Sequence, residues 1–314
     1  MKKILVLLLL TIVVFNGFGQ AIKRFNPDTI NTIQLDSTVK ITAQKFGIET
    51  FINAIITDQS FYQSFRNMKK YTFTAENRIF TYDKNNKVEG KIYRKIKHNN
   101  DGPYKMEYLA KEESGTLYKK NGKFQLYTVE MFDYIFMNPQ NSDLVTEGPM
   151  TSGGKGGNEG YKDKLKTLIF TPGRPIKGLP FIGDKTLIFS ANMRQYYDYS
   201  YDSGTYLDSI PVYRFKVAVK KDISSSTKDG LMIKTLTTIF DKRNFAILGR
   251  YVDMKYSNML FDFDVQMNIE MSYFGEEKLP TKISYQGNWD YPFKKEERAS
   301  FLIVHKDYHL GKGK

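Results

Sequence analysis

The chain has 314 residues, of which 15% are aromatic, and it contains no cysteine, which excludes disulfides, thiolate metal sites and a cysteine nucleophile. Lysine and arginine (47) outnumber aspartate and glutamate (34), and the formal charge of +13 would suit an anionic partner such as lipid head groups. The lysines are spread along the predicted strands, however, where lysine commonly protects a sheet against aggregation. The charge alone therefore defines no binding site.

Residues 1–19 have the pattern of a signal peptide. Lys2 and Lys3 precede an apolar run over 4–15, and Gly17 and Gly19 supply the small residues that signal peptidase reads, so we predict cleavage after Gly19. The apolar run is shorter than the roughly 20 residues of a membrane span. No cysteine follows it to carry a lipid. We therefore expect an exported protein of the periplasm or cell surface, not lipid-anchored, whose residues 20–314 form one domain.

Helical spacing of apolar residues appears in two places. Asp36-Ser37-Thr38 is a plausible helix start, and the apolar residues between 39 and 65 recur at the spacing of one helix face. This pattern predicts two short helices, or one helix broken near 58–60. A second amphipathic stretch covers 130–136 and is ended by Asn138-Pro139.

Most of the remaining chain predicts antiparallel strands. From 261 to 271 apolar and polar residues alternate without interruption, which predicts a strand with one apolar and one polar face. The Asn121-Gly122 pair, flanked by aromatic and aliphatic residues, predicts a tight hairpin. The other expected strands begin at Tyr71, cover 88–97, follow in a meander from Ile210, and end near 297–305; the meander strands are 210–220, 231–241, 245–257, 260–274 and 279–289.

These elements together predict an α+β fold. We expect a strongly curved antiparallel sheet, an incomplete barrel, with the helices from 36–67 and 129–137 packed on its concave face.

The arrangement resembles the outer-membrane lipoprotein carrier and receptor superfamily, and more closely a group of exported Bacteroidetes domains of unknown function. The resemblance rests on the segments 54–60, 71–77, 168–172 and 206–217 and on the closing meander. In the carrier fold a half-barrel wraps around helices and encloses an apolar cavity for acyl chains. The resemblance thus implies a binding protein for lipid or lipoprotein, although a shared fold does not fix a function.

We therefore expect non-catalytic binding of an apolar or amphipathic ligand in the cell envelope, without cofactor or metal. Burial of apolar surface would drive binding, and lysines at the rim could meet an anionic head group or membrane surface. The expected lining residues lie on the second helical stretch and on the meander: Phe132, Phe136, Tyr213, Phe215, Phe261, Phe263, Val265 and Met267.

An alternative is that these residues are plain core. The protein would then be an envelope scaffold with a filled interior, which binds another envelope protein through an exposed sheet edge. Nucleic acid is not expected as a partner, because the chain is predicted to be exported and has no cluster of basic and aromatic residues typical of such proteins.

No catalytic constellation stands out, so we predict that the protein is not an enzyme. His305, Asp307 and His309 would share one face of a regular strand and could bind a metal ion, but they lie close to the chain end. His98 precedes a run of turn residues and is expected to be solvated. A hydrolase would require Tyr196, Asp198, Asp202 or Asp208 to converge beside His98 or His305.

Overall fold

The computed structural model of the protein describes residues 33–34, 47–139, 170, 172–173, 183–257, 262–290 and 296–312. The expected signal peptide, the helix start at Asp36 and the candidate lining residue Phe261 lie outside these residues.

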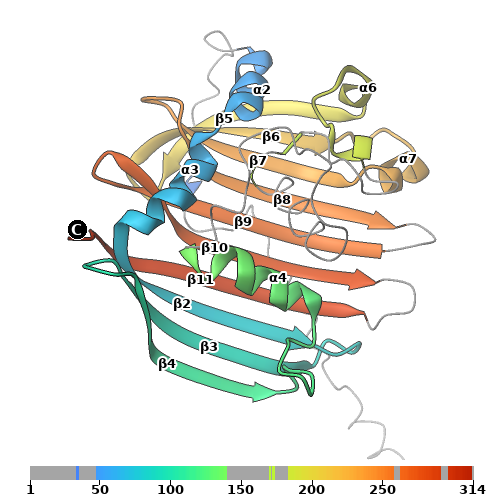
Figure 1. The fold of residues 1–314 in the computed structure, drawn as a ribbon. Helices are drawn as coiled ribbons and strands as arrows, with labels where there is room; N and C mark the ends of the chain where they lie inside the picture. Colours follow the sequence, from blue (N-terminus) through green and yellow to red (C-terminus); the bar gives the residue numbers. More distant parts are fainter. Residues whose placement is uncertain are drawn as a thin grey trace, which may run out of the picture.

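All described strands belong to one curved antiparallel sheet (Figure 1). Its eleven strands are ordered β1-β5-β6-β7-β8-β9-β10-β11-β2-β3-β4, so that β1 and β4 form the two edges and the sheet is not closed. The last long strand of the chain, β11, pairs with both β10 and β2. The strands are β1 Ile33–Gln34, β2 Tyr71–Tyr82, β3 Val88–Asn99, β4 Lys105–Gly115, β5 Tyr197–Tyr206, β6 Ile210–Val219, β7 Ile233–Asp241, β8 Ile247–Ser257, β9 Asp262–Phe274, β10 Glu277–Asp290 and β11 Glu297–Leu310.

The meander predicted from Ile210 onward is confirmed, and its strand boundaries differ from the prediction by a few residues at most. In β9 the predicted alternation holds over its first half, where Phe263, Val265 and Met267 are buried. It fails over the second half, where Asn268 and Glu270 on the opposite face are buried as well. The reason is a second apolar cluster on that face, made of Tyr206, Val212, Ile239, Leu248 and Tyr251.

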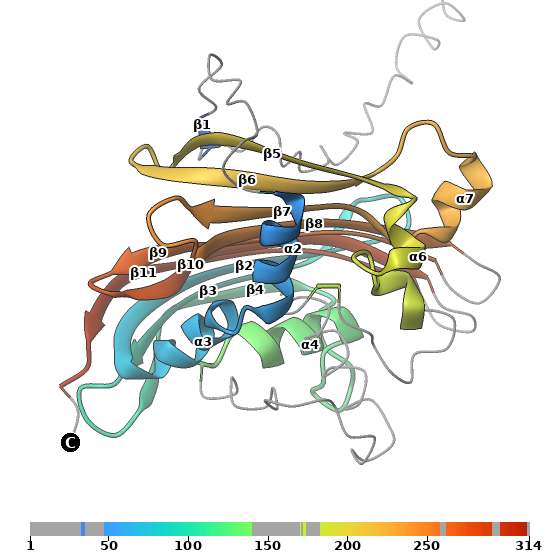
Figure 2. The same cartoon turned by 90° about the horizontal axis from the view of Figure 1, so that it is seen from above.

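Helices α2 (Ile48–Thr57), α3 (Ser60–Asn67) and α4 (Tyr127–Phe136) lie against one face of the sheet (Figure 2). We call this the helix face and the opposite one the outer face. Shorter helical turns are η2 (Met68–Lys70), η4 (Gly183–Thr186), α6 (Ala191–Arg194) and α7 (Ser225–Gly230). None of the helices in the described part of the chain combines the length and the apolar character needed to cross a membrane.

The break between α2 and α3 falls at Asp58, as the spacing predicts. Its carboxylate accepts hydrogen bonds from the backbone N–H groups of Ser60 and Phe61, both at 3.1 Å, and so satisfies the free donors at the start of α3. The start of α4 is bound by a residue that is distant in the sequence. Glu297 of β11 accepts hydrogen bonds from the backbone N–H groups of Tyr127 and Thr128, each at 2.8 Å, which fixes the start of α4 at β11.

At the β4 end of the sheet the predicted hairpin is smaller than expected, and one strand was not predicted. Asn121-Gly122 does form a turn, closed by a 2.8 Å bond from Lys119 N–H to Lys123 O, but its flanks form only an isolated bridge and do not join the sheet. The strand that does extend the sheet, β4, is absent from the predicted elements. In its sequence polar and apolar residues alternate only from Lys105 to Tyr108, before the bulge at Leu109, and apart from Ala110 and Glu113 its residues are exposed.

Candidate functional site

The seven described residues of the predicted lining are brought together on the helix face or on the side of α4 that packs against it. Six of them are buried and Tyr213 is half-buried. Phe132 stacks on Phe301 with ring centroids 4.4 Å apart, and Phe215 stacks on Phe51 of α2 at 5.1 Å. Side chains of α2 and β11 therefore pack against Phe215 and Phe132, whereas Phe263 packs against Tyr256 and Trp289 of the neighbouring strands.

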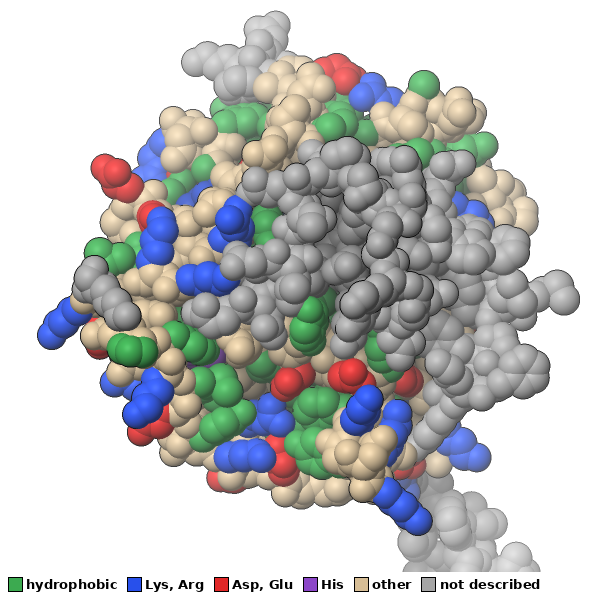
Figure 3. Space-filling view, viewed as in Figure 1, with side chains coloured by type: hydrophobic (Ala, Val, Ile, Leu, Met, Phe, Trp, Pro, Cys, Tyr) green, Lys and Arg blue, Asp and Glu red, His purple; other side chains and the backbone are tan. Residues whose placement is uncertain are grey.

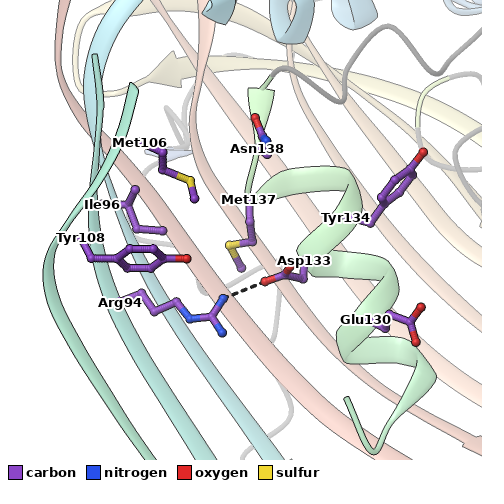
Figure 4. Close-up of a pocket in the computed structure, with 9 residues that line it drawn as sticks. All are labelled: Arg94, Ile96, Met106, Tyr108, Glu130, Asp133, Tyr134, Met137 and Asn138. Atoms are coloured by element: carbon purple, nitrogen blue, oxygen red, sulfur yellow. Dashed lines mark hydrogen bonds and ion pairs between the residues drawn. The ribbon is translucent and has the colours of Figure 1, made fainter. Parts of the chain in front are cut away.

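A pocket of about 310 Å³ lies instead between α4 and strands β3 and β4 (Figure 4). We call it the edge pocket. The strand residues project toward the helix, and Met137 and Asp133 project back toward the strands (Figure 4). The lining residues are Arg94, Ile96, Met106, Tyr108, Glu130, Asp133, Tyr134, Met137 and Asn138.

The edge pocket exposes large apolar side chains. Met106 is 38% exposed and Tyr108 47% exposed, whereas their cross-strand neighbours His98 and Ile96 are buried. In the space-filling view hydrophobic side chains reach the surface in the region of β3 and β4, interspersed with acidic and basic ones (Figure 3). The cause is the position of β4 as the edge strand, because α4 packs over β10 and β11 and leaves the helix face of β4 uncovered (Figure 1).

One wall of the edge pocket is an ion pair. Arg94 is 6% exposed. Its guanidinium donates to Asp133 Oδ1 at 2.8 Å and to Glu113 Oε1 at 3.0 Å, and it also lies 3.3 Å from the Tyr118 hydroxyl. Burial raises the pKa of Asp133, and the nearby Arg94 charge only partly opposes this. Burial tends to lower the pKa of Arg94, but the two carboxylates outweigh it and the pKa is raised. The guanidinium charge is thus satisfied within the protein.

The chemistry available in the edge pocket is that of an apolar binding site. Ile96, Met106, Met137 and the ring of Tyr108 form its apolar surface, and thioethers adapt readily to differently shaped apolar groups. Within the described part of the chain, no three histidine, aspartate or glutamate side chains are grouped so that they could hold a metal ion.

The metal site considered at the C-terminal end is not formed. The register of β11 against β2 shifts between Lys306 and His309, and Asp307 takes a positive φ of 58°. This bulge places His305 opposite Ala75 on the helix face but His309 opposite Thr72. His305 is therefore 4% exposed, whereas the His309 side chain is 56% exposed.

The prediction that His98 is solvated is wrong. His98 is 1% exposed, stacks on Phe73 with ring centroids 4.5 Å apart, and its Nδ1 lies 2.9 Å from the Tyr104 hydroxyl. The turn begins only after it. The sequence did hold a sign of this, because Ile92, Ile96 and His98 are spaced by even numbers and so share the apolar face of one strand.

The grouping that a hydrolase would require is also not formed. Asp198 and Asp202 lie on β5, whereas His305 lies on β11, with five strands between them, or about 29 Å measured along the sheet. Asp202 is engaged by Arg214 at 2.6 Å. The alternating tyrosines of β5 have structural partners, since Tyr197 donates to the backbone carbonyl of Ile233 at 2.9 Å.

Comparisons with known proteins give no family and no relative of known function for this chain. No protein-family model matches the chain, and no curated protein matches it. A solved structure of a DUF1329 family protein from Desulfovibrio piger is similar over 84% of this chain and 91% of that one, with 9% sequence identity and a TM-score of 0.24.

Proposed function

We propose that this protein is an exported, non-catalytic binding protein of the cell envelope, and that it takes an apolar or amphipathic ligand such as an acyl chain into the edge pocket. In this proposal α2, α3 and α4 lie on the concave side of a half-barrel, as in the lipoprotein carriers that the sequence resembles. The aromatic residues beneath the helices then serve as the core, and the ligand binds at the edge of the sheet.

The observation that carries the proposal is the exposure of Met106 and Tyr108 on the helix face of β4. Large apolar side chains exposed together beside a pocket are typical of a binding surface. Covering them would contribute about 25 cal/mol per Å² of apolar area removed from water. The volume of about 310 Å³ is at the lower end of ligand pockets, so it suits a segment of an acyl chain.

The ion pair in the wall indicates how the ligand is oriented. Arg94 already meets Asp133 and Glu113, so an anionic head group would compete with two carboxylates for it. A charged head group would therefore stay in solvent at the mouth, near the exposed Lys105, while the acyl chain contacts Met106 and Met137.

Uptake of a fluorescent fatty acid by purified residues 20–314 tests the proposal. We expect saturable binding that Met106→Asp weakens at least tenfold, because a carboxylate would then replace apolar lining. Leu109→Asp is the matched control, since Leu109 is 48% exposed on the same strand but does not line the pocket. Absence of uptake, or equal uptake by the wild type and Met106→Asp, would contradict the proposal.

The exposed edge of β4 favours a second candidate, an envelope scaffold that binds a partner strand. Two features of β4 weigh against it. A bulge at Leu109 interrupts the register with β3, and Lys105 and Lys111 place charge along the edge. Native mass spectrometry of the protein from its exporting host separates the two candidates, because a scaffold would retain a protein and a carrier a lipid.

A further inference from the structure

A second arginine, Arg250 of β8, is buried without sufficient partners. It is 1% exposed on the helix face, and its guanidinium carbon lies 4.3 Å from the centroid of the Phe61 ring. Nη1 donates to the backbone carbonyl of Phe170, whereas Nε and Nη2 make no hydrogen bond. A buried guanidinium ordinarily has its donors satisfied, because an unpaired buried charge costs several kcal/mol.

The carboxylate nearest to Arg250 is already engaged. Asp58 Oδ2 lies 3.5 Å from Arg250 Nη2, but the Asp58 carboxylate accepts hydrogen bonds from Ser60 N–H, the Ser60 hydroxyl and Phe61 N–H, at 2.7 to 3.1 Å. It therefore serves first to cap α3. Arg250 is left with a weak electrostatic contact.

A second cation adds to the imbalance. Lys278 Nζ donates to the Ser60 hydroxyl at 2.9 Å and to the backbone carbonyl of Ile247 at 3.2 Å. Arg250, Lys278 and Asp58 together carry two positive charges and one negative charge. The Asp241 carboxylate also acts on Lys278, but it is paired with Arg243 at 2.7 Å. Burial lowers the pKa of Lys278, and it lowers the pKa of Arg250 to about 10.

A third buried donor without a hydrogen bond lies on the neighbouring strand β7. Thr238 of β7 is directly opposite Arg250, so the two side chains share the helix face and their Cβ atoms lie about 5 Å apart. Thr238 is fully buried, and its hydroxyl has no hydrogen-bond partner. Arg94, by contrast, is a buried arginine with two carboxylates within 3.0 Å. The Nε of Arg94 also makes no hydrogen bond, so what distinguishes Arg250 is the lack of a carboxylate within 3.0 Å of its guanidinium.

We propose that Arg250 and Thr238 form a buried binding site for a small monoanion, either a halide or the carboxylate group of a small acid. A single negative charge would balance the excess charge of the cluster, and Nε, Nη2 and the Thr238 hydroxyl would donate to it. Because Arg250 is 1% exposed and its guanidinium already contacts the Phe61 ring and the Phe170 carbonyl, we expect the site to take only small anions. The site lies under α3, apart from the edge pocket, so either proposal can fail without the other.

Thermal unfolding of residues 20–314 in different sodium salts at constant ionic strength tests this site. Chloride and acetate are the probes, and gluconate is the reference anion that is too large to be buried. We expect chloride or acetate to raise the unfolding temperature of the wild type by about 3 °C or more over gluconate, with saturation. A response to chloride alone would assign a halide, and a response to acetate would assign a carboxylate.

Substitutions at Arg250 and Thr238 test whether these two residues bind the anion. Arg250→Met should abolish the difference between anions, and Thr238→Val should reduce it while keeping the shape of the core. Arg214→Met is the control, because Arg214 pairs with Asp202 on the outer face. Equal unfolding temperatures in all three salts, or the same anion response in Thr238→Val and Arg250→Met as in the wild type, would overturn the proposal and leave ordered water as the partner of these donors.

Should Arg250→Met fail to fold, Thr238→Val and a crystal soaked in bromide decide the question. Anomalous scattering from bromide beside the Arg250 guanidinium is the expected result. Bromide absent from that position, together with an unchanged response in Thr238→Val, would overturn the site.

Discussion

The hydroxyl of Tyr285 lies directly over the backbone of Gly287, two residues further along β10. A Cβ atom on Gly287 would be 2.1 Å from that hydroxyl. The same hydroxyl accepts a 2.8 Å hydrogen bond from Trp289 Nε1, and the Tyr285 ring packs 4.4 Å from the ring of Phe132 in α4. Glycine is therefore required at 287 to make room for an aromatic side chain that connects the sheet to α4.

Gly287→Ala should destabilise the protein by about 1–3 kcal/mol, because the new methyl group displaces the Tyr285 ring from its contact with Phe132. Urea unfolding followed by circular dichroism measures the change. Gly102→Ala is the control, since nothing lies within 4 Å of a Cβ at that position, and it should change stability by less than about 0.5 kcal/mol. Unaltered stability of Gly287→Ala would show that the ring can move at no cost.

Phe132→Ala should be among the most destabilising substitutions in α4, at about 3–5 kcal/mol. Phe132 is 1% exposed and stacks on Phe301 with an interplanar angle of 10°. Phe132→Leu should recover part of the loss, because it refills most of the volume. A loss below about 1 kcal/mol for Phe132→Ala would mean that the space beside α4 is not tightly packed, and unfolding by urea distinguishes these outcomes.

Two buried histidines make the fold sensitive to acid. Burial lowers the pKa of His98 to about 4 and that of His305 to about 3, from the ordinary value of 6.5. The unfolded chain therefore binds more protons below pH 6.5. Stability is fully present above that pH and falls as the pH drops toward 4 and then 3, by up to about 1.4 kcal/mol per pH unit for each histidine.

His305→Phe should remove about half of this pH dependence. A phenyl ring fits beside Phe73, and the carbonyl of Pro280 keeps its 2.7 Å hydrogen bond from the Tyr308 hydroxyl. The unfolding free energy measured between pH 7 and pH 4.5 gives the slope. His309→Asn, at an exposed position, should retain the wild-type slope, and an equal slope in His305→Phe would contradict the assignment.

Arg94→Met should destabilise the protein by about 2 kcal/mol at pH 7, because it leaves the partly buried carboxylates of Asp133 and Glu113 without their cation. The loss should be smaller at pH 4.5, where these carboxylates can take up protons. Arg78→Met is the control, since Arg78 is 54% exposed and lies 3.9 Å from Glu76. The same loss at both pH values would exclude unpaired carboxylates as the cause.

Periodicity in the sequence predicts the parts of this fold that obey it. Strands β6 to β10 alternate apolar and polar residues, and their boundaries were predicted closely. The helical spacing likewise predicted the break between α2 and α3, whereas the predicted helix start at Asp36 lies outside the described residues and α2 begins at Ile48. β4 could not be found in this way, because it lies at an edge, where neither face must be apolar. The second half of β9 was misjudged because a second cluster covers its outer face.

The candidate sites depended on contacts that no spacing encodes. The edge pocket exists because α4 packs on β10 and β11 and does not reach β4. The position of α4 is fixed partly by Glu297, which is far from α4 in the sequence. The sequence around Arg250 does not distinguish it from an exposed arginine on a strand. Its burial follows from the pairing of β7 with β8 and from the packing of Phe61 of α3 on its guanidinium. The bulge at Asp307 likewise separates His305 from His309.

The pairing of β11 with β2 bears on how the chain reaches its fold. β2 and β3 are made early, but the edge of β2 stays without its partner until residues 297–310 have been synthesised, as in the pair Arg298 and Tyr82. Contacts between such distant segments slow folding, because the loop between them must close first. Until then two strand edges, on β2 and β10, are open to wrong pairing. β11 thus joins the two halves of the sheet, and both halves keep an open edge until it is in place.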